Sequence, residues 1–156
     1  MNKEQIRYSI LALVLLIFFI GSYQLVKIRD INIKDLDQEL GKIELKNSVK
    51  ADDKDLRNIY GLDSKDLDSY IFYRPKTNMD AEEILICKTE NPQEIKEKVD
   101  KRIEKQEESF KNYARDKYDL LEDRYYQVEG DYLILVVSEQ KDDLLKVIKG
   151  GKYESK

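Results

Sequence analysis

The chain has 156 residues, enough for one domain of ordinary size and an accessory segment. Its 28 basic residues against 32 acidic ones give a net charge of -4, which argues against nucleic-acid binding, because that needs a basic surface. The sequence contains no His and a single Cys, Cys87, which excludes His-containing triads, His-ligated metals, zinc clusters and internal disulfides. We therefore predict no catalytic, cofactor-binding or metal-binding residue.

Residues 8–26 form a run of 19 residues without a charge, bounded by Arg7 and Lys27. As a helix this run would be about 28 Å long, close to the thickness of the hydrocarbon layer of a bilayer. We therefore predict a transmembrane helix with the lipid bilayer as its partner, and an uncleaved signal-anchor over residues 1–28. The alternatives are a cleaved signal peptide, which the bulky Tyr23 fits poorly, and a buried helix of a soluble protein.

The basic residues on the two sides of this run nearly balance, so charge does not set its orientation. A short N-terminal tail before a signal-like segment usually stays in the cytoplasm. We therefore expect a single-pass protein of the cell membrane with residues 27–156 outside the cell. These residues carry 26 basic and 31 acidic side chains, and so acidic a surface should be repelled by anionic lipids and wall polymers.

Two short helices open the rest of the chain. Residues 29–50, a connector next to the membrane, carry apolar residues at helical spacing. A second helix is predicted to begin at Asp52 or Asp53 and to end at Tyr60. Gly61 suits the left-handed position just past that end.

Two strands follow these helices. Residues 70–73 are rich in β-forming side chains and stop at Pro75, and residues 84–87 form the second strand. Between them Asp80 and Glu83 have the spacing of a capping box, which predicts a brief helical turn.

The longest predicted helix begins after Asn91, an expected N-cap, with Pro92 in the first helical position. Its apolar stripe is narrow, so one face should lie on a sheet: Ile95, Val99, Ile103, Gln106, Phe110 and Tyr113. The remaining surface alternates Lys and Glu, which are poor at binding because they are costly to desolvate. We therefore predict a packing element.

A hairpin and a last helix complete the domain. After a short helical stretch around residues 116–121, two strands flank Gly130-Asp131, a two-residue turn that suits type II′. The continuously apolar run from Tyr132 to Val137 is typical of a central strand covered on both faces. The final helix is predicted over residues 140–149.

The order α-α-β-β-α-β-β-α predicts an α+β domain over residues 51–150, followed by a frayed tail over residues 151–156. The domain should contain a four-stranded, mostly antiparallel sheet with one long helix packed on it.

Five segments carry a family resemblance over about residues 53–148. They are Ile59-Tyr60-Gly61-Leu62, Asn78-Met79-Asp80-Ala81-Glu82-Glu83-Ile84, Gln106 with Phe110 and Tyr113, Gly130-Asp131-Tyr132 and Val136-Val137-Ser138. In this order and spacing the sequence resembles the bacterial domain of unknown function DUF4358. The resemblance implies a short protein held at the envelope of a Gram-positive bacterium, often as a lipoprotein, without an established activity. This chain departs by lacking the lipoprotein Cys and by having Ala114-Arg115 where members often carry Pro.

The acidic clusters at residues 52–55 and 63–68 lack the order of a calcium-binding loop, so helix capping explains them better. Cys87, in a predicted buried strand, is interpreted as a core residue, with an intermolecular disulfide as the alternative. Paired carboxylates can hydrolyse glycosidic bonds, so a carboxylate-dependent envelope hydrolase is kept as an alternative function.

Eleven tyrosines against four Phe and no Trp favour a binding surface, because Tyr buries much area at low entropic cost. The candidate partner surface consists of Tyr113, Tyr118, Tyr125 and Tyr126, although these rings could also simply cover the sheet edge. The leading prediction is a non-enzymatic extracytoplasmic domain that binds an envelope protein or a wall component, and does not bind nucleic acid.

Overall fold

The computed structural model describes residues 5, 8–17 and 31–151, and the chain divides into two units at residue 30. In the first unit the described residues 8–17 are helical. None of the helices in the described ranges is long and apolar enough to cross a membrane. This finding contradicts the transmembrane helix predicted over residues 8–26, of which residues 18–26 lie outside the described residues.

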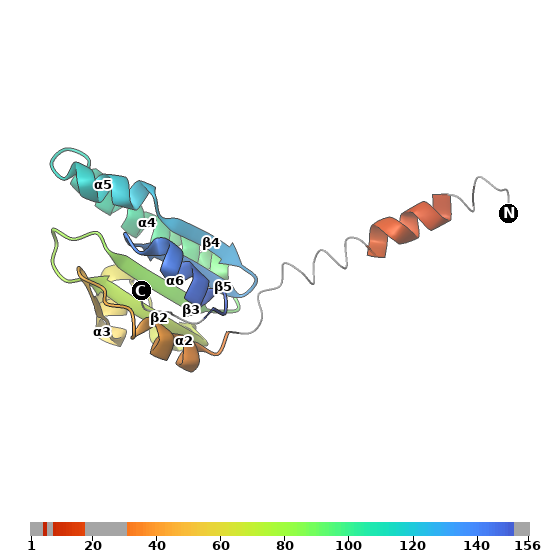
Figure 1. Ribbon diagram of the computed structural model, residues 1–156, viewed down its shortest axis with the longest axis horizontal. Coiled ribbons are helices and arrows are strands. Elements are labelled where there is room, and N and C mark those ends of the chain that lie inside the picture. Colours follow the sequence, from red (N-terminus) through yellow and green to blue (C-terminus); the bar gives the residue numbers. More distant parts are fainter. Residues whose placement is uncertain (1–4, 6–7, 18–30, 152–156) are drawn as a thin grey trace. The chain divides into compact units, whose positions relative to one another are not determined.

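The second unit has the predicted α+β class (Figure 1). Its helices are α2 (Ile33–Leu40), α3 (Asp53–Tyr60), the short 3-10 helix η1 (Ser64–Asp66), α4 (Pro92–Phe110), α5 (Arg115–Glu122) and α6 (Lys141–Ile148). Its strands are β1 (Ser48–Lys50), β2 (Ser69–Pro75), β3 (Glu83–Lys88), β4 (Tyr125–Glu129) and β5 (Tyr132–Val137). They form one sheet in the order β1-β2-β3-β5-β4, with every neighbouring pair antiparallel.

The sheet therefore has five strands where the sequence predicted four. The additional strand, β1, is only three residues long and pairs with the outer edge of β2, where Ser48 lies opposite Pro75. The buried carboxylate of Glu82 helps to hold it, because it accepts hydrogen bonds from the Asn47 backbone N–H at 2.9 Å and the Ser48 hydroxyl at 3.3 Å. A strand this short, held by a residue 34 positions away, leaves no periodic signal in the sequence.

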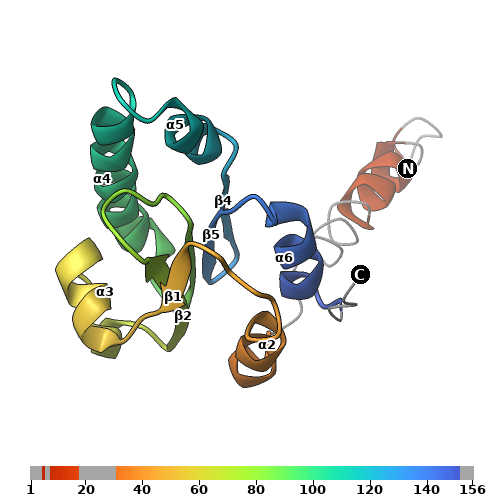
Figure 2. The ribbon, with the colours of Figure 1, turned by 60° about the vertical axis from the view of Figure 1, so that its left-hand side comes forward.

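Both faces of the sheet are covered by helices (Figure 2). Helices α3, α4 and α5 cover one face, where their apolar side chains share a core with Phe72, Leu85 and Leu135. Helices α2 and α6 lie over the other face. This arrangement confirms the prediction for residues 132–137: β5 lies between β3 and β4, and all six of its side chains are buried.

Two predicted glycine positions are confirmed. Gly61 ends α3 with a φ of 65°, and its N–H bonds to the carbonyl of Arg57. Gly130 has a φ of 61° in the two-residue turn between β4 and β5, while the φ of Asp131 is not positive, as a type II′ turn requires. Asn91 does precede α4, but its side chain makes no capping bond to the backbone.

Cys87 lies on β3 and faces the α4 side, completely buried, with its sulfur 3.9 Å from the Leu133 carbonyl oxygen. Burial raises the pKa of this thiol to about 12. Since only the thiolate reacts, about one molecule in 10⁴ is reactive at pH 8. We expect no reaction of the folded protein with Ellman's reagent over hours and complete reaction in concentrated urea. Rapid labelling without unfolding would contradict the buried position.

Candidate functional site

The four tyrosines of the predicted partner surface lie in separate places. Tyr113 follows α4, is 65% exposed and packs edge-on against Phe110 with ring centres 6.3 Å apart. Tyr118 lies on α5, half-buried against the core. Its hydroxyl donates to Glu122, and this hydrogen bond is the main reason why its pKa is raised.

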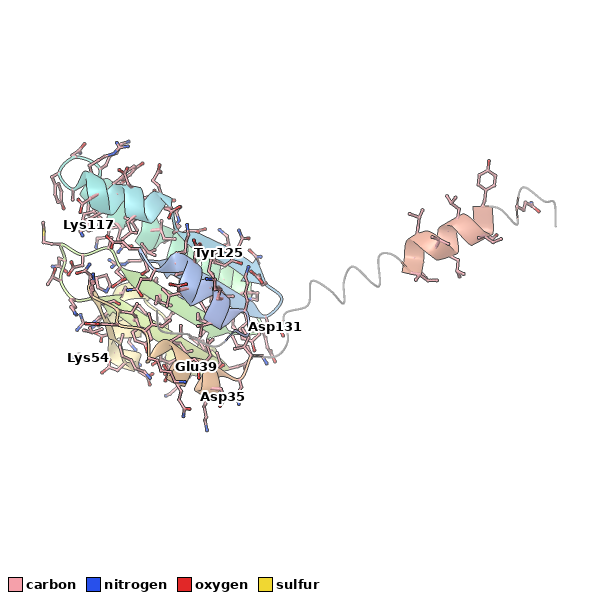
Figure 3. All side chains as sticks on the ribbon, viewed as in Figure 1. Asp35, Glu39, Lys54, Lys117, Tyr125 and Asp131 are labelled. Atoms are coloured by element: carbon pink, nitrogen blue, oxygen red, sulfur yellow. The ribbon has the colours of Figure 1, made fainter. Side chains whose placement is uncertain are left out.

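Tyr125 and Tyr126 are neighbours on β4 and therefore point to opposite faces of the sheet. Lys149 lies 5.1 Å above the ring of Tyr125. Burial is the main cause that raises the pKa of Tyr125, which is labelled in Figure 3, to about 12. Tyr126 donates instead to the Asp100 carboxylate on α4 at 2.8 Å, and its pKa is raised chiefly by burial. The four rings thus do not form one patch, and their role in partner binding stays a prediction.

A buried charge network lies between α3, α4 and β3. Glu83, the first residue of β3, is completely buried. Its carboxylate accepts hydrogen bonds from the Tyr60 hydroxyl, from Arg102 at 3.0 Å and from Gln106 at 3.1 Å. The pKa of Tyr60 is raised well above its usual range, first by burial and then by the Glu83 charge, so this hydroxyl stays a donor.

This network corrects the predicted helical turn between β2 and β3. Asp80 does act in a turn, because its carboxylate accepts hydrogen bonds from the Thr77 N–H at 3.1 Å and the Thr77 hydroxyl at 2.8 Å. Glu83, in contrast, belongs to the strand and faces α4, so the two residues do not form a capping box and residues 77–82 are not helical. The spacing alone could not distinguish a capping Glu from a buried one.

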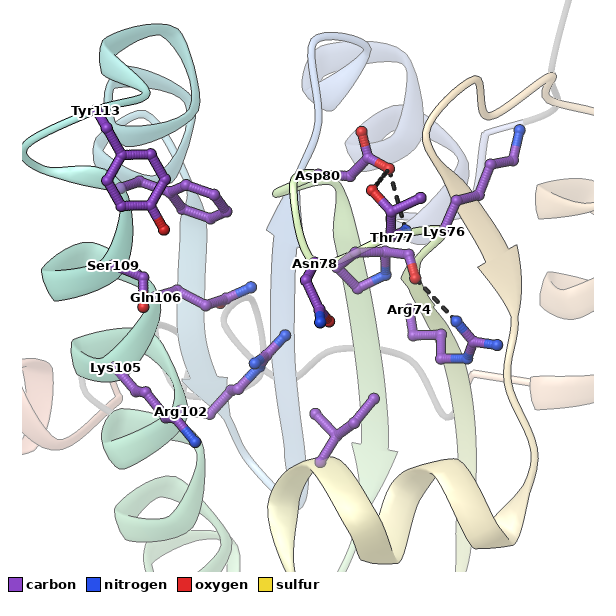
Figure 4. Close-up of a pocket in the computed structure, with 13 residues that line it drawn as sticks. Arg74, Lys76, Thr77, Asn78, Asp80, Arg102, Lys105, Gln106, Ser109 and Tyr113 are labelled. Atoms are coloured by element: carbon purple, nitrogen blue, oxygen red, sulfur yellow. Dashed lines mark hydrogen bonds between the residues drawn. The ribbon is translucent and has the colours of Figure 1, made fainter.

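Beside this network, two adjoining pockets of about 420 and 450 Å³ run along α4, with Ile59, Arg102 and Lys105 in the lining of both. We call them together the basic groove, because six cationic side chains line them: Arg74, Lys76, Lys98, Lys101, Arg102 and Lys105. Of the described residues in the lining, Asp80 is the only carboxylate. In Figure 4, Arg102 and Gln106 point from α4 toward Asn78 on the loop between β2 and β3.

Four of the six cations of the groove come from one flank of α4. Lys98, Lys101, Arg102 and Lys105 follow the i, i+3, i+4, i+7 spacing that places residues on the same helix face. Acidic residues on a different flank face β4 and α5, where Asp100 and Glu107 pair with Lys96 and Arg124. From the sequence, this surface was described as an even alternation of Lys and Glu. The spacing of the basic residues is a signal that could have revealed the groove.

The cations of the groove differ in how their donors are used. Arg74 forms an ion pair with Asp55 at 3.1 Å, and Lys98 donates to the Gly61 carbonyl at 3.0 Å. Lys101 and Lys105 are exposed and make no hydrogen bond or ion pair with any other described residue.

Arg102 uses only part of its guanidinium group to bind Glu83. Its Nε atom is buried and has no hydrogen-bond partner among the described residues. A buried donor without a partner costs about 1–3 kcal/mol. An anionic group in the groove can pair with the exposed part of this guanidinium and with the two free lysines.

In the described ranges, no group of three or more Cys, Asp or Glu residues is placed to hold a metal ion.

Fold and groove together define a small three-layer α+β domain with a cationic groove on one helical face. The family model "Domain of unknown function (DUF4358)" matches residues 41–138, more than half of the chain, and the chain belongs to this family. The resemblance derived from the sequence is thus confirmed. A search of the curated proteins found no match, and neither did a search of the solved structures.

Three of the five segments that carry the family resemblance contribute to the lining of the groove. Their residues in this lining come from α3 and its end, from the loop after β2, and from α4 with the turn behind it: Ile59, Tyr60, Gly61, Asn78, Asp80, Gln106, Phe110 and Tyr113. Tyr60 and Glu83, from two of the same segments, form the buried network behind it. Of the four predicted tyrosines, only Tyr113 lies in this lining.

Proposed function

We propose that this DUF4358 chain is a non-enzymatic binding domain of the bacterial cell envelope, and that its ligand, a wall component or an envelope protein, lies in the basic groove. The observation that carries the proposal is a concave surface that presents the free donors of Lys101 and Lys105 beside the partly exposed guanidinium of Arg102. Tyr113 adds an exposed aromatic ring at one end. The envelope location rests on the family resemblance and is part of the proposal.

The alternative function, a carboxylate-dependent hydrolase, requires two carboxylates that face the same bond of a ligand. Asp80 is occupied by Thr77, and Glu83 lies behind Arg102, completely buried. No observation on the described residues therefore favours the alternative, and the experiment below also tests it.

The full-length chain, purified in mild detergent, should sediment with isolated cell walls or envelope membranes of a Gram-positive bacterium. Tyr113→Ala and the double variant Lys101→Gln/Lys105→Gln remove only exposed groups, so both should stay folded by circular dichroism and lose most of this binding. Lys111→Gln, the same substitution at an exposed residue of α4's C-terminal end outside the groove, should bind like the native chain.

Full binding by both folded variants would exclude the groove as the site. Release of soluble sugar fragments from the walls by the native chain, lost in Asp80→Asn, would instead establish the hydrolase.

A further inference from the structure

The basic groove has a definite length and direction. From Lys98 to Phe110 it follows α4 over about 18 Å, at about 1.5 Å per residue, and it ends at Tyr113 in the turn behind the helix. The cations at Lys98, Lys101, Arg102 and Lys105 succeed one another along this line, instead of converging on one point. A row of charges in a groove matches a ligand whose negative charges are also arranged in a row.

The lining also discriminates between kinds of linear polyanion. A single nucleic-acid strand is usually held by aromatic rings that stack on successive bases. The basic groove offers one exposed ring, Tyr113, at its end, whereas Phe110 and Tyr60 are buried. The lining also contains hydrogen-bonding groups that suit hydroxyls: Asn58, Thr77, Asn78 and Ser109.

An acidic protein segment fits less well, because protein interfaces are depleted in Lys and anchored by buried apolar side chains. Four of the six cations here are lysines. Of the apolar residues in the lining, Tyr60, Pro75 and Phe110 are buried, so only Ile59 and Tyr113 offer accessible apolar surface.

We infer that the basic groove binds a phosphodiester-linked polyol chain, a linear wall polymer whose phosphates pair with Lys98, Lys101, Arg102 and Lys105 and whose hydroxyls bond to the polar lining. This inference rests on the proposed function and names its ligand class. This inference departs from the expectation that the acidic surface repels wall polymers, because salt at physiological strength weakens the effect of exposed charges that lie more than about 8 Å away. Within the lining itself six cations stand against one carboxylate, Asp80.

The test is the salt dependence of binding to a short poly(glycerol phosphate) chain, measured by calorimetry with the full-length protein. Four phosphate contacts at a slope of about -0.7 each predict that affinity falls about 50-fold between 50 and 200 mM salt. Lys101→Gln/Lys105→Gln removes two contacts, so the fall should shrink to about sevenfold, with weaker binding at low salt. Lys111→Gln should keep the native salt dependence.

Three further polyanions serve as probes: inorganic polyphosphate, a single-stranded oligodeoxynucleotide and polyglutamate. Each carries the same number of charges as the poly(glycerol phosphate) chain. The glycerol polymer should bind more tightly than the last two and should displace the protein from cell walls. Equal binding of polyglutamate or of the oligonucleotide would overturn the inference, as would a salt slope that the double variant leaves unchanged.

A wall or membrane interaction that requires Lys101 and Lys105, but that neither phosphate polymer displaces, would overturn the inference and leave the proposed function standing. Binding of inorganic polyphosphate as tight as that of the glycerol polymer would show that the hydroxyl contacts contribute nothing, and would overturn the choice of a polyol chain.

Discussion

Replacing Glu83 by Ala should lower the free energy of unfolding by about 3 kcal/mol, measured by urea denaturation. The substitution removes a completely buried carboxylate and leaves Arg102, Gln106 and Tyr60 without their shared acceptor. Breaking a buried ion pair by removing one partner typically costs about 3–5 kcal/mol. We expect a loss at the lower end of this range, because the Arg102 side chain is 22% exposed and can turn its charge toward water.

The matched control is Glu104→Ala, the same substitution at an exposed residue of α4, which should change stability by less than about 0.5 kcal/mol. A double-mutant cycle with Arg102→Ala then isolates the pair. The double variant should lose less than the two single variants together. If the losses of the two single variants simply added, Glu83 and Arg102 would not stabilise one another, and the buried network would be contradicted.

Leu135→Ala should destabilise the domain by about 2–5 kcal/mol, the usual cost of truncating a buried leucine in a site that cannot collapse. Leu135 is 1% exposed in the middle of β5, between Leu85 on β3 and Tyr126 on β4. Rigid strands on both sides prevent the cavity from closing. Urea denaturation of the full-length chain gives the measurement.

Leu145→Ala provides the control for this loss, because Leu145 lies on α6 and is only partly buried. It should cost about 1 kcal/mol. A cost for Leu135→Ala no greater than that of the control would show that β5 is not a central strand.

Most of the fold was predictable because its elements carry local signals. The end of α3 was located by Gly61, whose positive φ only glycine adopts readily, and the turn between β4 and β5 by Gly130. The central place of β5 followed from six consecutive side chains that could not face water. In each case the neighbouring residues alone determine the outcome.

The features of the fold that were not predicted depend on residues that are distant from one another in the sequence. The strand β1 exists because its backbone meets β2 and Glu82, neither of which lies near it in the chain. Glu83 has the spacing of a capping residue, and only the approach of α4 turns it into a buried acceptor. The groove was not predicted for a different reason. The charges of α4 were counted along the chain and were not assigned to separate faces of the helix.

The order of the strands also has a consequence for how the chain assembles. Hairpins β2-β3 and β4-β5 join strands that follow one another directly, whereas β3 and β5 meet only across the intervening α4 and α5, with Cys87 opposite Leu133. Contacts this distant in sequence carry the larger loop-closure entropy and form slowly. During synthesis, β3 therefore presents an unpaired apolar edge until the last strand emerges, and an edge of that kind is a template for aggregation.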